Sequence, residues 1–120
     1  MRRLDFTQQA RADLSEILDH SMEVFGPVAR ARYETLLEVS ILALIRDPLL
    51  MGSQARDELN FAIRTYHLRH GRPWAKARGV TVSTPRHFIA YRFDETSVLI
   101  VRILHEAMDL ARHLPPQGPA

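Results

Sequence analysis

The sequence contains no cysteine, and its longest apolar runs, ILALI at 41–45 and VLIV at 98–101, are short. The lack of cysteine excludes disulfide bonds, thiolate metal sites and cysteine nucleophiles, and it suits a reducing compartment. A membrane-spanning helix needs about 20 consecutive apolar residues, so neither run predicts one. No apolar stretch follows the two N-terminal arginines, which argues against a secretory signal. We therefore expect a cytoplasmic protein with no membrane partner.

Lysine is nearly absent too, because 15 of the 16 basic residues are arginine. Residues 1–60 hold seven Arg and ten acidic residues, whereas residues 61–120 hold eight Arg, one Lys and four acidic residues. Five of the six histidines also lie in the second half. A basic second half predicts an acidic partner, either nucleic acid or an acidic protein segment. Arginine favours bidentate contacts with carboxylate or phosphate, although a codon bias toward arginine explains the excess equally well.

Apolar residues at helical spacing predict two helices, at 8–25 and 28–46. Thr7 is a suitable N-cap for the first helix. Gly26 and Pro27 separate the two, because glycine suits the position after a helix and proline suits the first turn of the next. The sequence therefore predicts a hairpin of two helices.

Short apolar runs, most of them rich in β-branched and aromatic residues, predict four strands. A final short helix is predicted after them. The strands are expected at 2–6, 61–68, 86–93 and 98–104, and the helix at 108–114. Residues 48–59 are expected to be an irregular connector, and residues 69–85, with two Gly and two Pro, a basic loop or insertion. The resulting order β-α-α-β-β-β, with the helix hairpin packed on a small, mostly antiparallel sheet, is an α+β fold. We expect one domain over 1–114 and a flexible tail at 115–120.

His105, Asp109 and His113 have the i, i+4, i+8 spacing of ligands on one helix, and Glu106 follows His105 as in the H-E-x-x-H zinc motif. The motif is broken, however, because Asp109 stands where its second His should be. His105 also follows a predicted strand directly, so it is expected at a strand end rather than inside a helix. We therefore expect no metal site and no cofactor.

The last two strands are expected to form a hairpin. We take Asp94 and Glu95 as a two-residue loop, since a three-residue loop would shift the register and exchange the partners. One face would then carry His87, Ile89, Tyr91, Val98, Ile100, Arg102 and Leu104. The other would carry Phe88, Ala90, Leu99, Val101 and Ile103. The second face is the more apolar, so we expect it to pack on the helices, with Leu37, Ile41, Val101 and Ile103 in the core. The first would be a binding surface or an acid–base site, or an ordinary mixed face covered by 69–85.

Trp74 stands among basic residues in the predicted loop, HGRPWAKARG. Such interleaving is found where single-stranded nucleic acid stacks on aromatic side chains. The alternative is a solvated loop in which Trp74 anchors the packing. No glycine-rich phosphate loop and no nucleophile elbow occurs in the sequence.

Several stretches together resemble ParE-type toxins of the RelE/ParE superfamily. They are QARADLSEILDHSMEVFGPVARARYETLL, IRTYHLRH, RHFIAYRF and VLIVRILHEAMDLARHL, which span most of residues 2–114. The most distinctive parts are the helix pair broken at FGP, the strand HFIAYR and the closing ILHEAMD. Residues 69–85 depart from the compact connection usual in this superfamily.

The resemblance implies a toxin of a type II toxin–antitoxin pair, neutralised by a cognate acidic antitoxin. ParE-type members are associated with inhibition of DNA gyrase, whereas RelE-type members are ribosome-dependent mRNA endonucleases with a Tyr or His near the chain end. The tail MDLARHL has no Tyr, and the strands have almost no Lys. We therefore expect a protein-binding gyrase inhibitor rather than an enzyme. An mRNA endonuclease is the alternative, and a toxin-fold remnant that only binds its antitoxin is a third possibility.

The expected roles of individual residues follow this choice. Antitoxin carboxylates are expected to meet three arginines, Arg64, Arg92 and Arg102. The target is expected to meet the closing segment at His105, Met108 and Asp109. If the protein is instead a nuclease, the catalytic residues would be Arg64, His87, Tyr91, Arg102 and His105.

Overall fold

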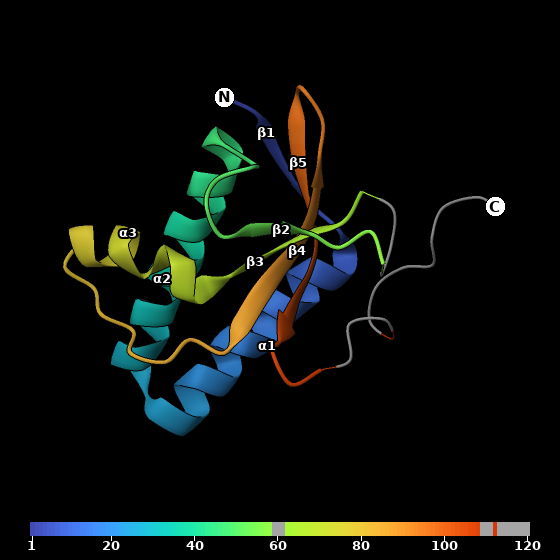
Figure 1. The fold of residues 1–120 in the computed structure, drawn as a ribbon. Coiled ribbons are helices and arrows are strands. Elements are labelled where there is room, and N and C mark those ends of the chain that lie inside the picture. Colours follow the sequence, from blue (N-terminus) through green and yellow to red (C-terminus); the bar gives the residue numbers. More distant parts are fainter. Residues whose placement is uncertain (59–61, 109–111, 113–120) are drawn as a thin grey trace.

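The computed structural model describes residues 1–58, 62–108 and 112, and its path is shown in Figure 1. The described residues form five strands, three α-helices and one 3-10 turn. In chain order these are β1 (Arg3–Phe6), α1 (Gln8–Phe25), α2 (Pro27–Arg46), β2 (Ser53–Ala55), β3 (Arg64–His67), η1 (Leu68–Gly71), α3 (Arg72–Ala77), β4 (His87–Phe93) and β5 (Ser97–His105). Within the described residues, no helix is long and apolar enough to cross a membrane.

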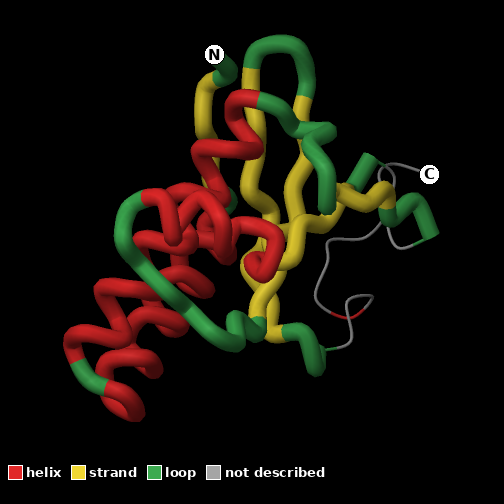
Figure 2. Tube along the Cα trace, turned by 60° about the vertical axis from the view of Figure 1, so that its left-hand side comes forward, coloured by secondary structure: helices red, strands yellow, loops and turns green. Residues whose placement is uncertain are grey.

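The strands form one mixed sheet in the order β1-β5-β4-β3-β2. β1 runs parallel to β5, and every other neighbouring pair is antiparallel. Figure 2 shows the helices on one side of this sheet. The predicted α+β class is confirmed, with the helix hairpin packed on a small, mostly antiparallel sheet.

The helix hairpin forms as its local signals predict. Thr7 caps α1, because its hydroxyl oxygen accepts a 3.0 Å hydrogen bond from the backbone N–H of Ala10. Gly26 follows α1 with φ of 92°, a left-handed value that favours glycine, and Pro27 begins α2. Short-range chemistry therefore fixes both the break between the helices and its position.

Three elements were not predicted from the sequence: β2, η1 and α3. β2 has the sequence Ser-Gln-Ala, without β-branched or aromatic residues, and it is a strand because it pairs with β3. The predicted loop 69–85 contains α3, which packs against α2, and the lack of a side chain at Gly71 permits the approach, since a Cβ there would collide with the Ser40 hydroxyl. The predicted final helix at 108–114 lies almost wholly outside the described residues, as does the tail at 115–120.

The predicted loop of the last hairpin is wrong. Phe93 pairs with Val98 instead of Thr96, and three residues, 94–96, connect β4 to β5. Asp94 stabilises this longer turn, because its Oδ1 accepts backbone hydrogen bonds of 2.8 Å from both Thr96 and Ser97. A β-bulge then shifts the register between Ala90 and Tyr91.

The assignment of the two sheet faces is also wrong. The helices cover the side that carries Ile89 and Tyr91, and both residues are fully buried in the main core. Burial of Tyr91 is possible because its hydroxyl hydrogen-bonds to Ser53 Oγ and, at 2.5 Å, donates to the carbonyl of Pro48. The supposed binding surface around Tyr91 is thus the interior of the protein.

The predicted core is correct for three of its four members. Leu37, Ile41 and Ile103 lie in the main core between the hairpin and the sheet. Val101 is buried as well, but it belongs to a separate small cluster with Ile63 and Ala90. Ile103 joins the helix side because of the bulge, since an inserted residue reverses the inward and outward alternation beyond it.

Candidate functional site

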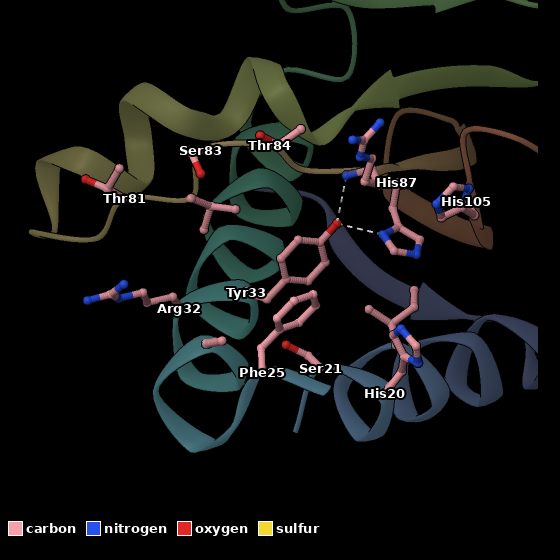
Figure 3. Close-up of a pocket in the computed structure, with 14 residues that line it drawn as sticks. His20, Ser21, Phe25, Arg32, Tyr33, Thr81, Ser83, Thr84, His87 and His105 are labelled. Atoms are coloured by element: carbon pink, nitrogen blue, oxygen red, sulfur yellow. Dashed lines mark hydrogen bonds between the residues drawn. The ribbon is translucent and has the colours of Figure 1, made fainter. Parts of the chain in front are cut away.

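A pocket of about 600 Å³ lies beside the tip of the helix hairpin (Figure 3). Its walls come from the end of α1, the first turns of α2, the segment that precedes β4, and the end of β5. Ile17, Phe25, Ala29 and Val82 give it an apolar lining. Its ionisable members are His20, Arg32, Tyr33, Arg86, His87 and His105, and none of the described residues that line it is acidic.

Tyr33 and His87 form the polar centre of the pocket. The Tyr33 hydroxyl lies 2.6 Å from His87 Nδ1 and accepts a 3.3 Å hydrogen bond from the backbone N–H of Arg86 (Figure 3). Burial raises the pKa of Tyr33 to about 12, so the Tyr33 hydroxyl keeps its proton near neutral pH. Burial, and secondly the neighbouring His105, lower the pKa of His87 to about 4. His87 is therefore neutral near pH 7, and its Nδ1 is hydrogen-bonded to the Tyr33 hydroxyl.

A network of ring contacts and ion pairs surrounds His87 and His105. The rings of His87 and His105 meet edge to face, with their centroids 5.3 Å apart. Glu106 follows His105, and its carboxylate lies 2.7 Å from His67 Nε2 and 3.2 Å from an Arg86 nitrogen. The hydrogen bond with His67 and then that with Arg86 lower the pKa of Glu106. The carboxylate of Glu106 is thus occupied by its hydrogen bonds to His67 and Arg86.

His87 is expected to make the protein less stable in mild acid. Its pKa is about 4 when folded and about 6.5 when unfolded, so the unfolded chain binds the proton more tightly. The free energy of unfolding should therefore fall as pH decreases from about 6.5 to 4. Urea unfolding at a series of pH values checks this, and His87→Asn should flatten the curve in that window. His20→Asn, on the exposed surface of α1, is the control, and an equal flattening by it would contradict the assignment.

Exposed apolar side chains continue the pocket wall at the hairpin tip. Phe25 is 71% exposed and Val28 62%, and Met22 and Val24 are exposed as well. Phe25 also lines the pocket. Contiguous exposed apolar residues beside a pocket are typical of a surface that binds a partner.

The residues predicted from the sequence to bind the antitoxin or to act in catalysis lie at different places in the structure. Arg102 is turned toward α1, where its guanidinium makes hydrogen bonds of 2.7 and 2.9 Å to the carboxylate of Asp13. Arg64 donates hydrogen bonds to Ser53, next to buried Tyr91. Arg92 lies on the face of the sheet away from the helices. Of the possible catalytic set, the pocket brings together only His87 and His105.

The closing segment is described in part. His105 ends β5, as predicted, so a continuous ligand helix does not pass through it. Met108 is exposed, whereas Asp109 and His113 lie outside the described residues. In the part of the chain that the structure describes, no group of three or more His, Asp or Glu is placed to hold a metal ion.

The pocket was not predicted from the sequence, although the hairpin analysis included His87. Tyr33 fits the apolar stripe of its helix, and its pairing with His87 joins residues 54 positions apart. Arg32 looks like an ordinary solvated helix residue. No signal in a single sequence marks these residues as neighbours.

Comparison with known families identifies the chain. Residues 4–110 match the family described as ParE toxin of the type II toxin–antitoxin system, parDE. The chain belongs to the ParE toxin family. The matched region runs from β1 past β5, so this ParE toxin has its hairpin, its sheet and its pocket within the family region.

Solved structures from toxin–antitoxin systems share this fold. A chain of the chromosomal ParDE toxin–antitoxin system from P. aeruginosa is 19% identical, with a TM-score of 0.63, and the match covers 88% of this chain and 96% of that one. A chain of the E. coli DinJ–YafQ toxin–antitoxin complex is 13% identical, with a TM-score of 0.54 and coverage of 88% and 93%. At these identities the likeness shows a shared fold. The search of curated protein sequences finds no significant match to this chain.

Proposed function

We propose that this ParE toxin inhibits DNA gyrase by binding it and is neutralised by a cognate acidic antitoxin. The observation that carries the proposal is the ParE family match over residues 4–110. A gyrase inhibitor of this kind would act in the cytoplasm and would need no cofactor. We propose that the target meets the closing segment at His105, Met108 and Asp109.

The geometry supports binding over catalysis. A nuclease needs its acid, base and charge-stabilising groups within reach of one phosphate. Tyr91 is fully buried, and Arg102 is paired with Asp13. His87 and His105 lie near Arg86, but its guanidinium is already paired with Glu106. The set expected for an mRNA endonuclease therefore does not converge on one point.

The basic surface supports an acidic antitoxin. Arg64, Arg92 and Arg102 remain the proposed contacts for its carboxylates, and arginine forms strong charge-assisted hydrogen bonds with carboxylates. Arg102 would have to exchange its bond with Asp13, so Arg64 and Arg92 are the better positions for mutation. A disordered acidic segment that folds on binding would suit exposed apolar and basic surface together.

Expression in cells tests the proposal. Production of the toxin without antitoxin should give filamentous cells with unsegregated DNA, because blocked gyrase prevents chromosome separation. Co-expression of the small protein encoded by the adjacent reading frame should restore normal division. Microscopy with a DNA stain and mRNA profiling read out the two mechanisms. Rapid, ribosome-dependent mRNA cleavage before any change in DNA would replace gyrase inhibition by the endonuclease alternative.

A further inference from the structure

We propose that the pocket beside the hairpin tip binds an acidic-apolar segment of the antitoxin, with carboxylates at its two ends and an apolar side chain between them. This inference rests on the proposed function, and it adds a docking site that none of the antitoxin contacts expected from the sequence includes. Neither Arg64, Arg92 nor Arg102 lines the pocket.

The two ends of the pocket both suit an anion. Figure 3 shows Arg32 at one end, near Thr81, and His87 with His105 at the other. Arg32 is exposed, and its guanidinium is a charged donor for a carboxylate. At the opposite end, the 2.6 Å hydrogen bond with Tyr33 fixes the ring of His87, and the ring of His105 lies beside it, so two imidazoles supply N–H groups there.

The charge of the lining selects the sign of the ligand. Among the residues that the structure describes, none of those lining the pocket is acidic, and Arg32 and Arg86 are positively charged. The carboxylate of Glu106 acts electrostatically on Tyr33 and His87, and its hydrogen bonds to His67 and Arg86 occupy it. An acidic group would therefore gain favourable contacts here, whereas a basic one would meet like charges.

The middle of the pocket and its rim favour a protein segment over a small anion. Phe25 and Val82 contribute apolar lining between the two ends. The apolar surface continues outside the pocket to Val28, which is 62% exposed. A small ligand would leave that outer surface uncovered, whereas a segment passing over the hairpin tip would bury it.

Charge reversal within the pocket tests the inference. The toxin is purified with the small acidic protein from the adjacent reading frame, separated and refolded, and their affinity is measured by fluorescence anisotropy. Arg32→Glu should weaken binding by about tenfold or more, because it removes a charge-assisted contact and adds repulsion. Arg30→Glu makes the same change on the same helix outside the pocket, and it should alter affinity by less than about twofold. Circular dichroism confirms that both variants fold.

Truncation of the apolar rim provides an independent measurement. Phe25→Ala should weaken binding by about tenfold, as expected of an aromatic anchor at an interface. Leu49→Ala removes an exposed apolar side chain just beyond the far end of α2 and should leave affinity unchanged. If a complex forms but Arg32→Glu behaves like Arg30→Glu and Phe25→Ala like Leu49→Ala, the antitoxin does not use the pocket. If the wild-type proteins form no complex, the proposed neutralisation itself is wrong, and the docking site with it.

Discussion

Replacing Asp13 by alanine should lower the free energy of unfolding by about 3 kcal/mol, because three hydrogen bonds depend on its carboxylate. Oδ2 accepts from Arg102 Nε at 2.7 Å and from the backbone N–H of Ile103 at 2.9 Å, and Oδ1 accepts from the second Arg102 nitrogen at 2.9 Å. The side chains of Asp13 and Arg102 are only 11% and 16% exposed, so water replaces these bonds poorly.

The position of Asp13 explains why the effect should be large. β1 pairs with the first half of β5, up to Ile100, and leaves the second half of that edge without a strand partner. Thr7 and Asp13 supply hydrogen bonds to that part of the edge. The Thr7 hydroxyl donates a hydrogen bond of 2.7 Å to the carbonyl of Val101, and the Asp13 carboxylate accepts one from the backbone N–H of Ile103. Asp13 thus joins α1 to the sheet at an edge that would otherwise be open.

Urea unfolding followed by circular dichroism measures the change. Asp19→Ala is the matched control, since Asp19 lies on the exposed side of the same helix, and it should cost less than about 0.5 kcal/mol. Equal losses for the two variants would show that the Asp13 network contributes nothing specific.

Replacing Leu37 by alanine should cost about 2–5 kcal/mol, because a cavity would open in the main core. Leu37 is 2% exposed and belongs to the cluster that joins α2 to Ile89 and Tyr91 on the sheet. Leu49→Ala is the same chemical change at a side chain that is 59% exposed, and it should cost less than about 0.5 kcal/mol. Denaturant melts that give a loss below about 1 kcal/mol for Leu37→Ala would contradict the described packing.

The helix hairpin could be predicted from the sequence because its signals are local. Thr7, Gly26 and Pro27 act on backbone within a few residues of themselves, and the helical spacing of apolar residues marks the buried stripe. The strands β4 and β5 were predicted for the same reason, since β-branched and aromatic residues dominate both.

The register and the faces of the sheet could not be predicted in this way. The turn depends on the Asp94 side chain, and a bulge shifts the pairing further along the hairpin, so an ideal two-residue loop predicts the wrong partners. The apolar count of each face was also misleading, because Tyr91 satisfies its hydroxyl inside the core through Pro48 and Ser53. A polar atom on a strand therefore does not place its face in solvent.

The pocket depends on tertiary structure still more strongly. Tyr33 comes from α2, His87 from the start of β4 and His105 from the end of β5, and only the folded sheet brings them together. Likewise, Arg102 looked like a free cation for a partner, yet its ion pair with Asp13 joins residues 89 positions apart. Residue type predicted the chemistry available to the chain, but not which groups would be used internally.

A supercoiling assay with purified DNA gyrase tests the central claim most directly. Relaxed plasmid, gyrase and ATP are incubated with increasing amounts of the refolded toxin, with and without the adjacent-frame antitoxin. We expect the toxin at micromolar concentration to block supercoiling, and an equimolar amount of antitoxin to restore it. Full supercoiling at micromolar toxin, by protein that circular dichroism shows to be folded, would contradict gyrase inhibition.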